Sequence, residues 1–241
     1  MLAAVVSVAL CGCGGGGPPR LVTETVGRGT QAATIIRPDV ERRLPVVLFL
    51  HGWGATQPRY YRPWLDHLAR EGNAVVYPRF QESVAEPPPQ VLGNVLAAVR
   101  LALPRIRRRP GAFVVAGHSA GGALAADYAA IARTARLPVP VAVFSAYPGR
   151  RLRGLPFALP EIDPRRIPAA TRLVALAGAR DRVVGQRPAR RLARLAGARR
   201  KSLVVVRDPA TADHLAPQRA DAPARRQFWT RLDRLMDTAR R

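Results

Sequence analysis

With 241 residues, 48% of them hydrophobic and 23% charged, the chain can bury the core of one domain, which excludes a mainly disordered or fibrous protein. Its net charge of +23 comes almost wholly from arginine, a composition that is also typical of GC-rich genomes. Because the basic runs are scattered and no aromatic residues lie among them, we expect no nucleic-acid partner, only weak long-range attraction to an anionic envelope or acidic polymer.

The first ten residues are almost wholly apolar, too few to span a bilayer as a helix but suited to a signal peptide. The following Leu10-Cys11-Gly12-Cys13 resembles a bacterial lipobox, and this resemblance implies that Cys13 becomes the lipidated first residue of the mature chain. We therefore expect a signal peptide and lipobox in residues 1–13 and a flexible Gly-rich tether in 14–20. The protein would be exported and anchored on the outer side of the cytoplasmic membrane. A plain secretory signal or an unstructured tail is the alternative, and the former would give a secreted protein.

Two short apolar segments, 21–26 and 32–36, follow the tether, and the glycines between them predict a β-hairpin. Continuous apolar runs, typical of strands buried on both faces of a parallel sheet, then predict strands at 46–50, 74–77, 113–116, 139–144, 173–177 and 203–206. Apolar residues at helical spacing or runs rich in alanine predict helices at 60–70, 91–108, 121–136, 189–195 and 224–240.

This order is a hairpin followed by strands and helices in alternation. Such an order favours an α/β fold with a mostly parallel central sheet of about eight strands and helices on both faces. No internal repeat or second domain is evident, so we expect one domain over residues 21–241.

The sharpest motif is G-x-S-x-G at Gly117-His118-Ser119-Ala120-Gly121, between a predicted strand and a predicted helix. A nucleophilic serine on a tight strand-to-helix turn needs small residues two positions before and after it, because the two backbones nearly touch there. Gly117 and Gly121 meet this demand. The helix that follows directs positive potential at developing negative charge.

These five residues resemble the nucleophile elbow of the α/β-hydrolase superfamily, and the order of elements resembles that family from residue 21 to the C-terminus. The resemblance is to serine esterases and lipases, and loosely to dienelactone hydrolases. It implies an α/β-hydrolase fold with Ser119 as nucleophile. The Pro- and Arg-rich stretch 148–168 lies where this family often carries a lid. At about twenty residues it is too short for a large cap domain, which predicts an open site.

A serine nucleophile needs a base, and the chain has four histidines. His51 ends the first parallel strand, His67 lies in an amphipathic helix, and His118 is held in the elbow with its side chain directed away from that of Ser119. His214 follows the last strand, in the loop 208–217, where this family places its base. The alternative is that His214 is an ordinary surface histidine.

The base in turn needs an acid that orients its ring. Asp181 follows the strand 173–177, in a stretch that resembles the family's acid loop, and we expect it to be this acid. Asp163 lies in the lid-like stretch, and Asp208 and Asp213 stand so close to His214 that we expect them to shape the loop. Alternatively, Asp181 is a solvated aspartate paired with a neighbouring arginine.

An oxyanion needs preplaced donors. One expected donor is the backbone N–H of Ala120. By resemblance to hydrolases with an H-G-x motif, the other is the N–H of Trp53 in Leu50-His51-Gly52-Trp53-Gly54, and its indole would line the acyl pocket. Gly54 is the rival donor, and a simple glycine turn is the alternative.

Together these parts predict a serine hydrolase that cleaves carboxylic esters, small or polymeric, through an acyl-enzyme on Ser119. We expect no metal and no cofactor, because no metal-ligand cluster and no phosphate-binding loop is present in the sequence. An acyltransferase that uses the same residues is one alternative. A non-catalytic basic envelope lipoprotein on this fold is the other.

Overall fold

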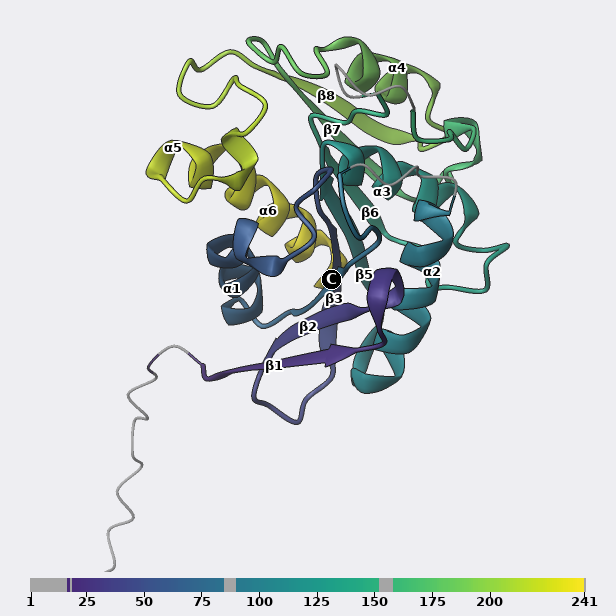
Figure 1. Cartoon of the computed structure of the whole chain (residues 1–241), viewed down its shortest axis with the longest axis vertical. Coiled ribbons are helices and arrows are strands. Elements are labelled where there is room, and N and C mark those ends of the chain that lie inside the picture. The colour runs from purple at the N-terminus through teal and green to yellow at the C-terminus, as the bar shows by residue number, and fades with distance from the viewer. Residues whose placement is uncertain (1–16, 18, 85–89, 152–157, 241) are drawn as a thin grey trace, which may run out of the picture.

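The computed structural model describes residues 17, 19–84, 90–151 and 158–240 (Figure 1). The predicted lipobox with Cys13 lies outside the described residues, as does most of the predicted tether. No helix in the described ranges combines the length and the apolar character that crossing a membrane requires.

The described residues form one eight-stranded sheet in the order β1-β2-β4-β3-β5-β6-β7-β8. β1 pairs antiparallel with β2 as the predicted hairpin, β2 pairs antiparallel with β4, and all other neighbours are parallel. The mostly parallel sheet of the prediction is thus confirmed. The strands are β1 Leu21–Val26, β2 Ala33–Pro38, β3 Leu44–Leu50, β4 Ala74–Pro78, β5 Arg108–His118, β6 Ala142–Ala146, β7 Arg172–Gly178 and β8 Arg200–Val206.

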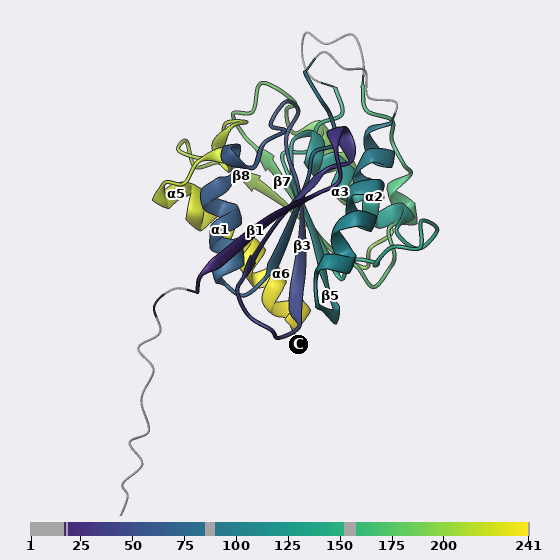
Figure 2. The ribbon, with the colours of Figure 1, turned by 60° about the horizontal axis from the view of Figure 1, so that its bottom comes forward.

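The helices lie on both sides of this sheet, which Figure 2 shows almost edge-on. The longer ones are α1 Arg62–Arg70, α2 Val91–Ala102, α3 Ala120–Ile131, α4 Arg187–Leu195 and α6 Thr230–Arg240. α5 Ala222–Ala224 leads into α6 through a π-helical turn, Arg225–Trp229. Short 3-10 turns occur at Gly29–Gln31, Pro58–Tyr60, Leu103–Arg105, Pro164–Arg166 and Ala216–Gln218.

The central strand β3 divides the core between the two sides of the sheet. Every residue of β3 is buried, and successive side chains point to opposite faces. Val46, Leu48 and Leu50 belong to one core cluster with residues of α2, α3 and α4, whereas Val47 and Phe49 belong to a second with residues of α1 and α6. Continuous apolar strands are therefore required here, because helices cover both faces.

Several predicted elements are wrong at one end: the helix predicted at 121–136 ends at Ile131, and the strand predicted at 113–116 begins at Arg108. Proline explains two further differences. The helix predicted at 91–108 ends at Ala102, because Pro104 has no N–H to continue it, and Arg108 already belongs to β5. The strand predicted at 139–144 begins only at Ala142, after Pro140, because proline cannot donate to the ladder of a central strand.

No large cap covers the carboxyl edge of the sheet in the part of the chain that the structure describes. Between β6 and β7, the described residues 147–151 and 158–171 form a single bridge, Arg151 to Ala158, and one short turn. Arg150 fastens the start of this connection to α3. Its guanidinium makes two hydrogen bonds to Asp127, at 2.7 and 2.8 Å.

Candidate active site

The turn between β5 and α3 holds Ser119 in a strained conformation, with φ 56° and ψ −122°. Strain of this kind persists only where the surroundings enforce it. A Cβ atom on Gly117 would overlap the backbone of Gly121, and one on Gly121 would overlap the carbonyl oxygens of Leu50 and His51. The small residues predicted around Ser119 are therefore required by the close approach of α3 to the sheet.

Three predicted residues from separate loops meet at the carboxyl edge of the sheet. His214 Nε2 lies 2.9 Å from Ser119 Oγ, and His214 Nδ1 lies 2.8 Å from Asp181 Oδ2. A carboxylate only accepts, so Nδ1 donates to Asp181 and leaves Nε2 to accept the serine proton. All three residues are less than a tenth exposed, which keeps water from competing for these bonds.

The carboxylate of Asp181 is held ionised. Burial alone would raise its pKa, but the hydrogen bond and charge of His214 and the backbone N–H groups of Val184 and Val183 together bring that pKa below its ordinary value. Those N–H groups lie 3.0 and 2.9 Å from Asp181 Oδ1. An ionised Asp181 can both fix the tautomer of His214 and stabilise its protonated ring.

The other candidate acids shape loops, as expected, and have no bond to His214. Asp208 Oδ1 accepts the N–H of Ala210, and Asp163 accepts the N–H of Arg165. Asp213 accepts the N–H of Leu215 and pairs with Arg219 at 3.1 Å.

His118 supports the base loop, a contact that the sequence analysis missed. Neither ring nitrogen of His118 bonds to Ser119, and its Nε2 donates to the backbone carbonyl of His214 at 2.8 Å. Its Nδ1 therefore accepts, and its partner is Tyr61 Oη at 2.7 Å. Burial, with a smaller contribution from the charge of His214, lowers the pKa of His118 to about 3, so the ring is neutral at ordinary pH.

The same tyrosine reaches the loop after β3. The N–H of Gly52 donates to Tyr61 Oη at 3.0 Å, and a Cβ on Gly52 would lie 3.4 Å from Ser119 Cβ. The N–H of Gly54, the rival oxyanion donor, is engaged by Gln81 Oε1 at 3.1 Å. The indole of Trp53 donates to the carbonyl of Val84 at 2.9 Å.

His51 stabilises this loop through a hydrogen bond and a ring contact. Its Nδ1 donates to the carbonyl oxygen of Gly52 at 2.7 Å, and its ring stacks on Phe80 with 3.8 Å between centroids. Burial lowers the pKa of His51 to about 3, so it is neutral and serves structure. Within the described ranges, no three His, Cys, Asp or Glu side chains are grouped closely enough to hold a metal ion.

The comparisons with known proteins agree with this architecture. A family model described as the alpha/beta hydrolase fold matches residues 47–194, from β3 to α4. This chain belongs to the α/β-hydrolase fold family.

Solved structures resemble this α/β-hydrolase over most of their length. A putative dienelactone hydrolase from Klebsiella pneumoniae is 19% identical with a TM-score of 0.67, over 90% of this chain and 99% of that one. Carboxyl esterase 2 from Tuber melanosporum is 20% identical with a TM-score of 0.70, over 94% and 88%. An esterase from Pyrobaculum calidifontis is 17% identical with a TM-score of 0.68, over 91% and 83%. At such identities the likeness shows the fold, and no curated protein matches the chain.

Proposed function

We propose that this α/β-hydrolase cleaves carboxylic esters, with Ser119 as nucleophile, His214 as base and Asp181 as the acid that orients the base. The observation that carries the proposal is the unbroken chain of hydrogen bonds from Ser119 Oγ through His214 to Asp181, at 2.9 and 2.8 Å. A hydroxyl becomes a competent nucleophile when an oriented base can take its proton during attack.

In the first half of the reaction, Ser119 Oγ attacks the ester carbonyl and its proton passes to His214 Nε2. The negative oxygen then receives hydrogen bonds from the backbone N–H groups of Ala120 and Trp53. The N–H of Gly54, the rival donor, is already engaged by Gln81 Oε1, which weighs against that alternative. The intermediate collapses, His214 protonates the departing alcohol, and an acyl ester remains on Ser119.

In the second half, His214 takes a proton from water as that water attacks the acyl ester. The second tetrahedral intermediate uses the same donors, and His214 returns the proton to Ser119 as the carboxylic acid leaves. Asp181 stays ionised throughout, and the lowered pKa of its carboxyl supports this role.

The deciding experiment is labelling of the full chain with a fluorescent fluorophosphonate, together with turnover of p-nitrophenyl butyrate. We expect both in the wild type and neither in Ser119→Ala. The matched control is Ser202→Ala on the exposed face of β8, which should label and turn over normally. A folded wild type that neither labels nor hydrolyses would contradict the proposal and favour a non-catalytic role. Ester formation with an added alcohol, in place of acid release, would favour acyl transfer.

We also propose that Cys13 carries a lipid that anchors the protein outside the cytoplasmic membrane. The support is the lipobox-like Leu10-Cys11-Gly12-Cys13 in the sequence. Incorporation of labelled palmitate in a bacterial host should be lost in Cys13→Ser and kept in Cys11→Ser. Loss only in Cys11→Ser, or no incorporation at all, would overturn this assignment.

A further inference from the structure

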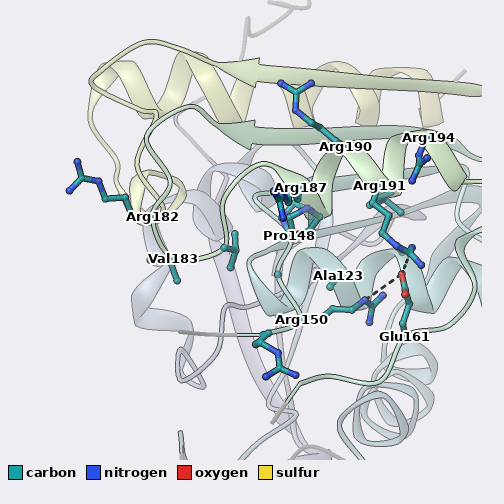
Figure 3. A pocket seen from close by; sticks show the side chains of 16 residues that line it. Ala123, Pro148, Arg150, Glu161, Arg182, Val183, Arg187, Arg190, Arg191 and Arg194 are labelled. Carbon is teal, nitrogen blue, oxygen red and sulfur yellow. Dashed lines mark hydrogen bonds and ion pairs between the residues drawn. The ribbon is translucent and has the colours of Figure 1, made fainter. Parts of the chain in front are cut away.

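A groove of about 900 Å³ adjoins the proposed site, and Figure 3 shows the side chains that line it. Its described walls are α3, residues 148–151 and 161 of the connection after β6, residues 182–184 of the loop that follows β7 and carries Asp181, and α4. Two of these walls touch the catalytic residues directly. The N–H of Gly149 donates to the carbonyl of Ser119 at 3.1 Å, and those of Val183 and Val184 donate to Asp181. The groove therefore adjoins the proposed site, although Ser119, Asp181 and His214 are not among the described residues that line it.

Arginine dominates the lining of this groove. The helix α4 presents Arg187, Arg190, Arg191 and Arg194 at helical spacing, and these line the groove together with Arg150 and Arg182 (Figure 3). Arg151 completes the set of seven in the described lining, against a single acid, Glu161.

Most of these positive charges have no acidic partner within the described residues. Glu161 is shared between Arg191 at 3.0 Å and Arg150 at 3.8 Å, and Arg150 is bound chiefly to Asp127. Among the described residues, the guanidinium of Arg190 bonds only to the neutral amide oxygen of Gln186. Arg151, Arg182, Arg187 and Arg194 make no ion pair in the parts of the chain that the structure describes. Like charges gathered in this way repel one another unless an anion lies between them.

The floor of the groove is apolar. Ala123 and Ala126 of α3 line it from one side and Leu192 of α4 from the other. A short hydrocarbon chain that leaves the ester bond at Ser119 can lie against these side chains, while an anionic end group meets the guanidinium groups. Arginine forks suit carboxylate and phosphate equally, through paired N–H donors.

We infer that this arginine groove binds an anionic group carried by the substrate, a carboxylate or a phosphate separated from the scissile ester by a short apolar spacer. The inference rests on the proposed ester hydrolysis and names its substrate class. The enzyme then prefers half-esters of dicarboxylic acids, or esters with a phosphorylated alcohol, to neutral esters of the same size.

The test compares esters that differ only in charge at the far end: monoethyl adipate, ethyl hexanoate and ethyl 6-aminohexanoate. In the full-length wild type we expect kcat/KM to be about tenfold higher for monoethyl adipate than for ethyl hexanoate, and lowest for the cationic ester, since one ionic hydrogen bond is worth about that factor. The preference should fall as salt rises, because the groove is open to screening. The matched pair 1-butanoylglycerol 3-phosphate and 1-butanoylglycerol distinguishes phosphate from carboxylate as the favoured anion.

The double variant Arg187→Gln/Arg190→Gln should lower the ratio of kcat/KM for monoethyl adipate over ethyl hexanoate about tenfold. The double variant Arg133→Gln/Arg234→Gln removes the same charge outside the groove and should leave that ratio unchanged. An equal ratio in the two double variants, or a wild-type preference for neutral esters, would overturn the groove assignment while Ser119-dependent hydrolysis stands.

Binding of adipate measured by calorimetry gives a readout that does not depend on turnover. We expect about tenfold weaker binding in Arg187→Gln/Arg190→Gln than in the wild type and in the control variant. Arginine-dependent binding without any hydrolysis would support the groove and contradict the proposed reaction. Absence of adipate binding in the wild type would contradict the groove.

Discussion

Tyr61 Oη and His118 Nδ1 are joined by a 2.7 Å hydrogen bond, although 57 residues separate them in the chain. Through this bond the buried Tyr61 contacts both the loop after β3 and the histidine that supports the loop of His214. Its oxygen accepts the N–H of Gly52 in the loop after β3, and His118 in turn donates to the backbone carbonyl of His214. The position of the base therefore depends on a residue just before α1 that has no part in the chemistry.

Tyr61→Phe should lower kcat about tenfold and destabilise the protein by about 1–3 kcal/mol, because Gly52 N–H and His118 Nδ1 lose a buried partner. The pH profile of kcat/KM should keep its shape, since His118, with its pKa of about 3, is neutral in both proteins above pH 5. Kinetics from pH 5 to 9 and urea unfolding measure both effects. Tyr60→Phe, at the exposed neighbouring position, is the control. Equal kcat in both variants would show that Tyr61 positions nothing.

Asp181→Asn should reduce kcat about a thousand- to ten-thousand-fold without loss of the fold. The amide oxygen can still accept from Val183 and Val184, which turns the NH2 group toward His214 Nδ1. That NH2 group donates, so the His214 proton moves to Nε2, which can no longer accept from Ser119. Asp213→Asn, one residue before His214, alters only the contacts with Arg219 and Leu215 and serves as control. Comparable losses in the two variants would refute the assignment of the acid.

The Asp181 variant should also change the acid limit of stability. A carboxyl whose pKa is lowered in the folded state contributes stability above its unfolded pKa, near 3.9, and that stability is lost as pH falls through the folded value. Wild type and Asp181→Asn should therefore converge in unfolding free energy below about pH 4. Parallel curves from pH 7 to pH 3 would contradict the lowered pKa.

The strands and the elbow residues around Ser119 (Gly117, His118 and Gly121) could be predicted because their sequence signals are local. The β3 run is apolar at every position, since both its faces are buried, and the elbow needs glycine where two backbones nearly overlap. His214 and Asp181 were found through their order after Ser119 along the chain, which the fold converts into proximity. Local signals failed at the ends of elements, such as α3, which ends at Ile131 and not at 136, and in two places a proline ended a helix or delayed a strand.

The supporting contacts could not be predicted, for a physical reason. Tyr61 and His118, or Arg150 and Asp127, meet only after separate elements have packed, and no spacing in the sequence links them. Likewise, the arginines of the groove belong to segments on both sides of β7. In the sequence they are part of a general arginine excess, and only the fold separates those that line one groove from the rest.

Gly121→Ala and Gly93→Ala should have opposite effects on stability. The new Cβ on Gly121 overlaps the carbonyl oxygen of Leu50, so we expect a loss of about 1–3 kcal/mol or more, with inactivation. Gly93 lies exposed in α2 with no atom within 4 Å of a new Cβ, so alanine there should add about 0.5–1 kcal/mol through its helix propensity. Thermal and urea unfolding report both. A tolerated, active Gly121→Ala would mean that α3 lies farther from β3 than described.

Arg150→Met should make stability depend strongly on pH. Asp127 is 1% exposed, and burial raises its pKa against the opposing effect of Arg150. In Arg150→Met the lowering effect of the guanidinium on the pKa of Asp127 is lost, and the charge of Glu161 raises that pKa further. A carboxyl whose pKa is raised in the folded state stabilises the protein fully below its unfolded pKa, near 3.9. That contribution to the free energy of unfolding is lost as pH rises through the folded-state pKa.

The loss in Arg150→Met should therefore reach about 3 kcal/mol at pH 7 and shrink as pH falls toward the raised pKa of Asp127, where the carboxylate takes up a proton. The side chain of Arg150 is 21% exposed, which keeps this figure at the low end for a broken buried pair. Urea unfolding at pH 5, 6 and 7 measures the trend. In the double variant Arg150→Met/Asp127→Asn no carboxylate is left to bury, so the pH dependence should disappear. If the single variant loses the same stability at all three values, Asp127 is not held ionised by Arg150, and the anchor of the connection after β6 must lie elsewhere.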